Sequence, residues 1–296
     1  MALIDTLAFI LSHPVGRKSR WKALSRFVRW QIGSRILPGE VVVDFVGDTR
    51  MLVRPSMTGA TGNIYVGICE FEEMGFLLHF LRRGDLVADV GANVGSYTVL
   101  AAGACGARVH SFEPVSATFE DLRNNVTLNR LDDRVVARNV AVGASGGSVE
   151  VSRDLDTVNR VVSKRSDVGV AVETVPQVRL DDELEEVPVV VKIDVEGFES
   201  QVLEGMPRLL ASDELLAVIM ELNASGMRYG VEDRALRRTM SEAGFLEYSY
   251  DPLRRALEVR PAGFERPCNS IFIRRRDAVE DRISSAPRVV VHDLEF

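Results

Sequence analysis

DLVADVGANVG, residues 85–95, places an apolar run directly before two glycines. An apolar run that ends at a turn signal is typical of a buried strand, which we expect at residues 85–90. Glycine lets the backbone bend sharply and approach a ligand closely, so we expect a tight loop at residues 91–95. An Ala- and Leu-rich helix is expected next, at residues 96–105. Strand, loop and helix in this order begin a βαβ unit of an α/β fold.

The same alternation continues toward the C-terminus and predicts a mostly parallel sheet covered by helices. Further strands are expected at residues 108–113, 135–142, 148–152, 187–195, 215–223, 245–250 and 270–275. Helices are expected at residues 116–129, 199–210 and 232–243. The last two strands are spaced like a hairpin, so we expect them at an edge of the sheet. The polar residues 153–172 are expected to form a surface insertion.

The chain is expected to form one α/β domain with two extensions. The domain is placed at residues 85–276 and a C-terminal tail at residues 277–296. The hairpin and the Gly-rich loop before residue 85 are not expected to build a separate core of any size, so we expect residues 1–84 to form a dependent cap. The cap is expected to contain an N-terminal helix, a hairpin at residues 41–46 and 50–53, and a Gly-rich loop at residues 58–67.

Glu113 ends the strand after the glycine loop, where a carboxylate can accept hydrogen bonds from both hydroxyls of a ribose. Three nucleotide sites compete for this pairing. A dinucleotide fold needs G-x-G-x-x-G, and Asn93 does not match it. A phosphate-binding P-loop needs a closing Gly-Lys-Ser/Thr, which this loop lacks. A G-x-x-x-G loop preceded by Asp89 instead suits S-adenosylmethionine, because an acid can lie near its cationic amino acid part and no phosphate has to be bound.

Three blocks of the chain closely resemble the FkbM-type methyltransferase family: GDLVADVGANVGSYTVLAA, VHSFEPVSATFEDLRNNVTLN and VVVKIDVEGFESQVLEGM. The resemblance covers residues 65–223. It implies a class I methyltransferase fold, which is a Rossmann-like sheet of seven mostly parallel strands with an antiparallel last strand. It further implies methyl transfer from S-adenosylmethionine to a hydroxyl oxygen of a small molecule, a sugar or glycan, or a polyketide. Donor contacts are implied for Asp89, Gly91, Asn93, Gly95 and Glu113.

Two residues of the cap align with the opening block of the same family. These are Tyr65 and Glu70, and the resemblance implies contacts to the donor or the acceptor. Tyr65 is equally well explained as an aromatic residue that packs in the core. Nothing in the family pattern corresponds to residues 153–172 or to the basic N-terminus, so the acceptor stays open.

Methyl transfer to a hydroxyl needs an aligned oxygen and a base that removes its proton. Lys192, Asp194 and Glu196 alternate at the end of an apolar strand, so the strand period of two predicts that they share one face. Buried charges have to be paired, which favours contacts among them or with a substrate. Asp194 is our first candidate for the base and Glu196 the second, with Lys192 as the electrostatic partner. A purely structural pair of Lys192 with one acid is the alternative.

A metal-free site is expected, and a Mg²⁺ site is the alternative. The next strand ends in Glu221 and Asn223, which we expect beside Asp194. Carboxylate and amide oxygens are ligands that Mg²⁺ accepts.

The composition disfavours several classes of protein. The net charge is −7, which gives no overall attraction to nucleic acid. The three cysteines are far apart and form no C-x-x-C pair, so we expect neither a disulfide framework nor structural zinc, as in the reducing cytoplasm. Residues 2–11 are apolar but too short to span a bilayer. Seven cations follow with no acid between residues 6 and 39, which predicts either a helix packed with solvated cations or docking to an anionic membrane or an acidic carrier.

Two rival functions remain at this stage. An N-methyltransferase of the adenine type would carry a [D/N]-P-P-[Y/F/W] strand end, whereas this chain has Asp194-Val195-Glu196-Gly197. A donor-binding or docking module without catalysis would not need the acids at positions 194 and 196. We therefore expect an O-methyltransferase.

Overall fold

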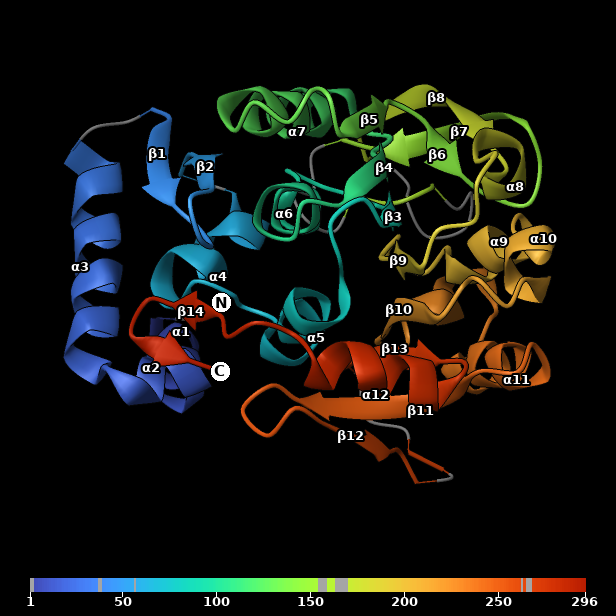
Figure 1. The fold of residues 1–296 in the computed structure, drawn as a ribbon. Coiled ribbons are helices and arrows are strands. Elements are labelled where there is room, and N and C mark those ends of the chain that lie inside the picture. The colour runs from blue at the N-terminus through green and yellow to red at the C-terminus, as the bar shows by residue number, and fades with distance from the viewer. Residues whose placement is uncertain are drawn as a thin grey trace.

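The centre of the protein is an eight-stranded sheet in the order β12-β11-β13-β10-β9-β3-β4-β5 (Figure 1). The computed structural model describes residues 3–36, 39–55, 57–153, 159–162, 170–261, 263–264 and 268–296. The strands are β3 (Leu86–Val90), β4 (Arg108–Phe112), β5 (Val135–Arg138), β9 (Val190–Ile193), β10 (Ala217–Leu222), β11 (Leu246–Asp251), β12 (Ala256–Val259) and β13 (Cys268–Ile273). All residues of β3 and β9 are buried, as the largely apolar runs predicted.

Strands β5, β4, β3, β9 and β10 are parallel, and β13 runs antiparallel between β10 and β11. This is the predicted class I methyltransferase sheet with its antiparallel last strand, extended by β12. The expectation that the last two strands lie at the edge as a hairpin is wrong for β13. Residues 252–255 instead turn the chain into β12, which pairs with β11 and forms the edge.

Helices cover both faces of the sheet because strand residues alternate between two hydrophobic clusters. Val87, Val109 and Val190 belong to the cluster that includes residues of α5, α6 and α7. Ala88 and Val191 belong to the cluster that includes residues of α9, α10 and α11. These helices are α5 (Phe71–Phe80), α6 (Ser96–Val99), α7 (Ser116–Leu128), α9 (Glu199–Glu204), α10 (Pro207–Ala211) and α11 (Asp233–Glu242).

Four expected elements differ from the structure. The helix at residues 96–105 changes into a π-helical turn, η1 (Leu100–Ala104). The helix at residues 199–210 is divided into α9 and α10, because proline lacks the amide hydrogen and fits only a first turn. The strand at residues 135–142 divides into β5 and β6 (Ala141–Val142), which belong to different sheets. The Gly-rich residues 58–67 form a helix, α4 (Thr58–Val66), rather than a loop.

A second, three-stranded sheet has the order β6-β8-β7. It contains the predicted strand β7 (Gly147–Ser152) and the unpredicted strand β8 (Val172–Val178), which precedes the short α8 (Leu180–Glu183). Of the expected insertion, residues 154–158 and 163–169 lie outside the described residues. Val161 forms a β-bridge with Val151, so this part of the insertion is tied to the small sheet.

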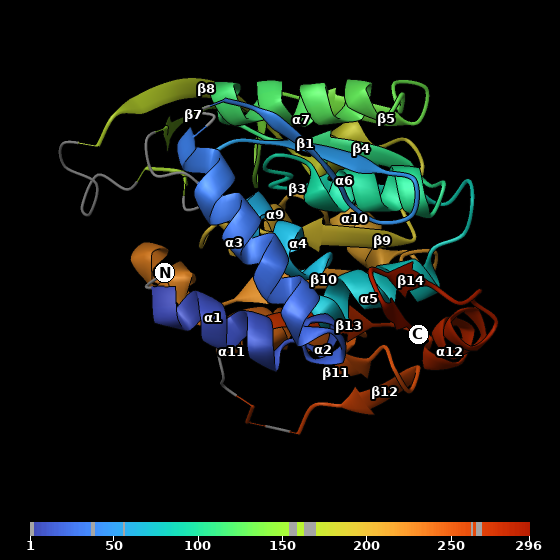
Figure 2. The same cartoon turned by 90° about the vertical axis from the view of Figure 1, so that its left-hand side faces the viewer.

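The N-terminal residues form α1 (Leu3–Ser12), α2 (Pro14–Lys18), α3 (Arg20–Ile36) and the predicted hairpin of β1 (Val41–Asp44) and β2 (Arg50–Val53). Figure 2 shows α3 crossing the front of the molecule. The chain ends in α12 (Arg276–Ser284), β14 (Val290–Val291) and β15 (Leu294–Glu295). Residues of both terminal segments, including Phe27 and Phe296, join the core cluster of the main sheet. Among the described helices, none combines the length and the apolar character needed to cross a bilayer.

Candidate functional site

The carboxyl ends of β3, β4, β9 and β10 border a cavity of about 350 Å³. This volume falls among those of small-molecule sites, roughly 300 to 1,000 Å³. In parallel α/β sheets, ligands bind at this edge. Predicted site residues that line the cavity are Glu70, Gly91, Asn93, Glu113, Lys192, Asp194 and Glu196.

The glycine loop after β3 has a backbone that most side chains would disturb. Gly91 has φ +77°, and a Cβ there would lie 1.8 Å from the carbonyl oxygen of Asp194. Asn93 has φ +50°, and its side-chain oxygen accepts a hydrogen bond of 2.7 Å from the Val94 amide. Asparagine tolerates the left-handed region better than most residues. The loop is thus held in one conformation, with its backbone pressed against the residues that follow β9.

Glu113 lies just after β4 and faces the glycine loop in the wall of the cavity. Its carboxylate accepts hydrogen bonds of 2.9 Å from the Asn93 amide and the Val115 amide, and the residue is only 6% exposed. Burial raises the pKa of Glu113 to about 7, although the two amide donors act in the opposite direction. An acid in this position can accept from ribose hydroxyls, which replace part of the water that a carboxylate normally keeps.

The residues that line the cavity around the glycine loop fit S-adenosylmethionine. Phe112, Val140, Val142 and Val195 give the cavity apolar walls next to Glu113, which suits a purine ring beside a ribose. The acids of the opposite wall suit a cationic sulfonium. Glu113 would hold the ribose, and the backbone of Gly91 and Asn93 allows close approach.

Lys192 and Asp194 form an ion pair at the end of β9. The distance from the Lys192 ammonium to the Asp194 carboxylate is 2.9 Å, with 5% and 30% of the two side chains exposed. Burial disfavours the ammonium, but Asp194 and Asp89 together raise the pKa of Lys192 above its ordinary value. Lys192 also lies 4.7 Å from the centre of the Tyr97 ring, a favourable cation–π distance.

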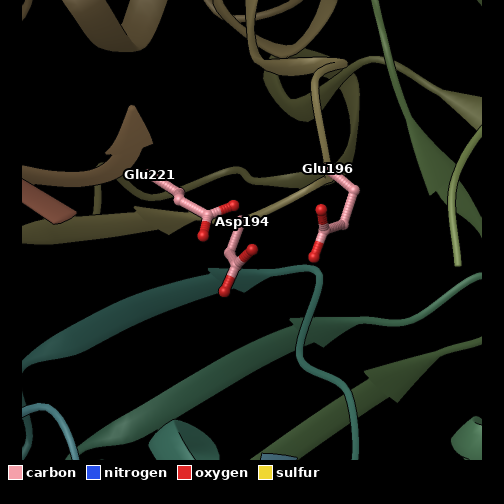
Figure 3. A group of neighbouring side chains, drawn as sticks. All are labelled: Asp194, Glu196 and Glu221. Atoms are coloured by element: carbon pink, nitrogen blue, oxygen red, sulfur yellow. The ribbon is translucent and has the colours of Figure 1, made fainter. Parts of the chain in front are cut away.

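Three carboxylates meet in the same part of the cavity: Asp194, Glu196 and Glu221. One oxygen of each lies within 4.8 Å of those of the other two, and Figure 3 shows the three side chains converging. Burial and the charge of Asp194 raise the pKa of Glu196 to about 7. Burial and the charges of Asp194 and Glu196 raise the pKa of Glu221 to about 9. At neutral pH this cluster therefore holds protons that exposed acids would have lost.

The loop after β9 is fixed by a buried acid that the sequence did not single out. Glu199 is 1% exposed and accepts hydrogen bonds of 3.3 Å from the Val195 amide and 3.0 Å from the Gly197 amide. Glu196 has φ +54°, a conformation that costs free energy in a non-glycine residue and concentrates at functional sites. Because the strand ends at Ile193, Glu196 reaches the cavity from this loop and not from the predicted strand.

Glu70 joins the cap to the cavity. It accepts a hydrogen bond from the Tyr97 hydroxyl and another, of 2.8 Å, from the Asn269 amide group. Tyr97 follows the glycine loop in α6 and Asn269 belongs to β13. One carboxylate thus ties three distant segments together beside Lys192. Tyr97 was missed at the sequence level because an aromatic residue in a helix is usually a packing residue.

Three predicted donor residues do not line the cavity. Tyr65 faces α3, where its hydroxyl accepts from Gln31 and its ring packs edge-on against Phe27, so the packing interpretation describes its contacts. Asp89 is buried behind the cavity and accepts a hydrogen bond of 2.6 Å from Thr98. Gly95 begins α6 with φ +91° and packs against Leu122.

The predicted metal ligands also change. Asn223 accepts a hydrogen bond from the Ser225 amide and does not line the cavity, whereas Glu196 takes the third place beside Asp194 and Glu221. Side-chain positions after a strand end depend on loop geometry, so alternation along the strand could not identify the third acid.

Residues of the expected surface insertion line the cavity as well. These are Asn159, Arg160 and Val161, and the Tyr229 hydroxyl donates a hydrogen bond to the Val161 carbonyl. The charge of Arg160 lowers the pKa of Glu196, against the larger effect of burial. A polar stretch without periodicity gave no signal that could place it at the site.

Comparison with known proteins also points to a methyltransferase. The Methyltransferase FkbM domain family matches residues 89–247. The hexuronic acid methyltransferase AglP of Haloferax volcanii is 30% identical over 172 residues, which cover 56% of this chain and 66% of that protein. The 31-O-demethyl-FK506 methyltransferase FkbM of Streptomyces tacrolimicus is 31% identical over 159 residues, covering 43% and 61%. The chain thus spans less than two thirds of the length of these two relatives.

Among solved structures, a methyltransferase FkbM from Methylobacillus flagellatus aligns with 86% of this chain and 60% of its own, at 16% identity and a TM-score of 0.45. The family match extends from the end of β3 through the glycine loop and both acidic strand ends to β11. Because the family match covers more than half of the residues of this chain, the chain belongs to the FkbM methyltransferase family.

Proposed function

We propose that this protein transfers the methyl group of S-adenosylmethionine to a hydroxyl oxygen of a sugar, a glycan or a hydroxylated small molecule. The observation that carries the proposal is the convergence of Asp194, Glu196 and Glu221 in the cavity that Glu113 and the glycine loop also line. The three acids supply a proton acceptor, and Glu113 with the glycine loop fits a nucleoside. Bound S-adenosylmethionine would supply a methyl group that its sulfonium already activates.

Asp194 is the proposed base. Its side chain is 30% exposed toward the cavity, and the Lys192 ammonium holds one of its oxygens in place. A neutral hydroxyl is a poor nucleophile, so proton removal by a placed carboxylate contributes roughly 10² to 10⁴-fold in rate. Lys192 stabilises the carboxylate before the reaction and orients it. Glu196 is the second candidate, because it lines the same wall and its pKa of about 7 suits proton transfer near neutral pH.

Glu221 is proposed to orient the acceptor. Its pKa of about 9 keeps it protonated at neutral pH, so it can donate a hydrogen bond to an acceptor oxygen while Asp194 takes the proton. Holding the acceptor oxygen in line with the methyl group contributes more than the base itself, up to roughly 7 to 11 kcal/mol.

The class of acceptor is proposed from the relatives. The names of AglP and FkbM refer to a hexuronic acid and to a 31-O-demethyl compound, both of which offer hydroxyl groups. Arg160 in the cavity wall gives a uronic acid carboxylate one cationic neighbour. We therefore place sugar acids and hydroxylated polyketides first among the acceptors.

The test is incubation of the full chain with methyl-labelled donor and three acceptor sets: hexuronic acids and their oligosaccharides, hydroxylated polyketides, and amines of similar size. Products are located by mass spectrometry and their linkage by NMR. An O-methyl product supports the proposal, and an N-methyl product overturns it. Saturable donor binding with no product from any set would favour a donor-binding module without catalysis.

A further inference from the structure

Charge is strongly segregated along this chain. Residues 1–39 contain seven Lys or Arg and one Asp, a net charge of +6, whereas residues 40–296 carry −13. The positive charge belongs to α2 and α3, which lie with α1 on one side of the molecule (Figure 2). A local field of this kind attracts anionic surfaces even though the whole protein is acidic.

Helix α3 exposes apolar side chains on the face that points away from the core. Trp21 is 85% exposed, Val28 47%, Ile32 54% and Ile36 69%. Their spacing of seven, four and four residues places them on one stripe of the helix, about 22 Å long. The opposite face is anchored by buried Phe27, whose ring contacts Tyr65. The exposed stripe is therefore the outer surface of a helix whose other side packs against the core.

Helix α1 also exposes apolar side chains. Ile4 is 79% exposed and Leu11 37%, and α1 packs against α3. Of the fifteen large hydrophobic residues that are exposed in the described chain, eight fall between Ile4 and Val42. Figure 1 shows α3 at the outer edge of the molecule, and Figure 2 looks directly onto it. We call the exposed side chains of α1, α2 and α3 the basic face.

Cations surround the apolar stripe of the basic face. Those with no acidic partner among the described residues include Arg17, Lys18, Arg20 and Arg29. All four are exposed. Lys22 does pair with Asp293, at 2.7 Å, and so links the basic face to the C-terminal segment. Exposed cations without an acidic partner can face an anionic surface without first breaking an ion pair.

We propose that the basic face docks on an anionic lipid bilayer, with the helix axis of α3 along the membrane plane. An apolar stripe with flanking cations and an interfacial tryptophan is the combination that binds headgroups and inserts shallowly. The surface is a convex helix rather than a groove, so it suits a deformable bilayer better than a partner helix. This inference concerns binding alone and does not depend on which acceptor is methylated.

The test is cosedimentation of the full chain with vesicles of phosphatidylcholine alone and of phosphatidylcholine with 30 mol% phosphatidylglycerol. We expect binding to the anionic vesicles at least about tenfold tighter than to the neutral ones, and loss of that difference at high salt. In the Trp30→Phe variant Trp21 is the only tryptophan left, and its emission should shift to the blue on anionic vesicles.

Two matched pairs of variants separate the basic face from general charge and hydrophobicity. Neutralising Arg17, Lys18, Arg20 and Arg29 to Gln should weaken binding at least about tenfold, whereas the same change at Arg83, Arg123, Arg234 and Arg238 should leave it intact. Trp21→Ser with Ile32→Ser should weaken binding, and Leu246→Ser with Leu253→Ser, which are 55% and 51% exposed, should not. Circular dichroism melts confirm that each variant is folded.

Three results would overturn the proposal. One is the absence of binding to anionic vesicles by the folded parent chain. Another is equal weakening in the basic-face and control variants. The third is a dimer in sedimentation velocity that Trp21→Ser with Ile32→Ser dissociates while vesicles remain unbound, which would assign the stripe to self-association.

Discussion

The ammonium of Lys192 lies 2.9 Å from a carboxylate oxygen of Asp194, and both side chains border the cavity at the end of β9. Lys192 is 4% exposed, and a buried charge of this kind costs several kcal/mol unless it is paired. The ion pair therefore compensates the buried charge of Lys192. It also fixes the position of Asp194 within the cluster of three carboxylates. Such an arrangement is useful to an enzyme, because the orientation of the proposed base is set before the acceptor binds.

Replacing Asp194 with Asn should lower kcat at least about 100-fold, because the amide cannot accept the hydroxyl proton. Donor affinity, measured by calorimetry with S-adenosylhomocysteine, should stay within about threefold of the parent, since the donor-side contacts are unchanged. Glu214→Gln, an exposed acid just before β10, is the control. Normal turnover of Asp194→Asn would remove Asp194 as the base.

Replacing Glu113 with Ala should weaken binding of S-adenosylhomocysteine at least tenfold, about 1.4 kcal/mol, because the ribose loses its acceptor. The amides of Asn93 and Val115 also lose their partner, so a thermal melt has to accompany the calorimetry. Glu120→Ala, in the exposed part of α7, serves as the matched control. Unchanged affinity in folded Glu113→Ala would contradict the ribose assignment.

The contribution of Glu221 to stability should fall as the pH rises from about 4.5 to 9. The pKa of Glu221 is raised from 4.5 to about 9, so across this interval the folded protein binds a proton that the unfolded chain has released. The free energy of unfolding then decreases with pH, by about 1.4 kcal/mol for each pKa unit of the shift. Glu221→Gln should show a flatter dependence and exceed the parent at pH 9 in urea unfolding. Parallel curves for the two proteins would refute the raised pKa.

Excess chelator should leave turnover unchanged. Lys192 already places a positive charge beside Asp194, and the raised pKa values of Glu196 and Glu221 keep protons in the cluster, so no cation is required to balance it. Activity is measured before and after EDTA treatment, with and without added Mg²⁺. If EDTA abolished turnover and Mg²⁺ restored it, the three carboxylates would be metal ligands instead.

Gly91→Ala should damage donor affinity and turnover together. The added Cβ meets the Asp194 carbonyl at 1.8 Å, and φ +77° strains any side chain, so the donor loop and the loop after β9 must both shift. Gly33→Ala is the control, since nothing lies within 4 Å of its Cβ and alanine favours a helix by about 1 kcal/mol. Intact donor binding in Gly91→Ala would show that the loop tolerates displacement.

The sequence predicted correctly those features that short-range patterns determine, such as apolar runs and turn signals. Buried β3 and β9, the glycine loop and the acid at position 113 follow from apolar runs and turn signals, and the structure places Glu113 against the loop as expected. The Lys192–Asp194 pair was likewise predictable, because two opposite charges at the end of an apolar strand are expected to form an ion pair.

The remaining features depend on contacts between distant segments. The position of β13 inside the sheet, the bond between Tyr97 and Glu70, and the approach of residues 159–161 to the cavity are set by tertiary packing. Helix α4 formed where glycines suggested a loop, because packing against α3 outweighs weak helix propensity. Strand β8 was missed because it follows a polar stretch and carries a proline at position 176.

The small β6-β8-β7 sheet has an evolutionary consequence. It is hydrogen-bonded separately from the parallel strands that carry the glycine loop and Glu113, yet Val161, bridged to its β7, reaches the cavity wall. Mutations near β7 can therefore reshape the wall at Val161, whereas β6 supplies Val142 to the apolar wall beside Glu113 and is constrained by the proposed nucleoside. A lineage with such a division can diversify what it modifies while inheriting its methyl source unchanged.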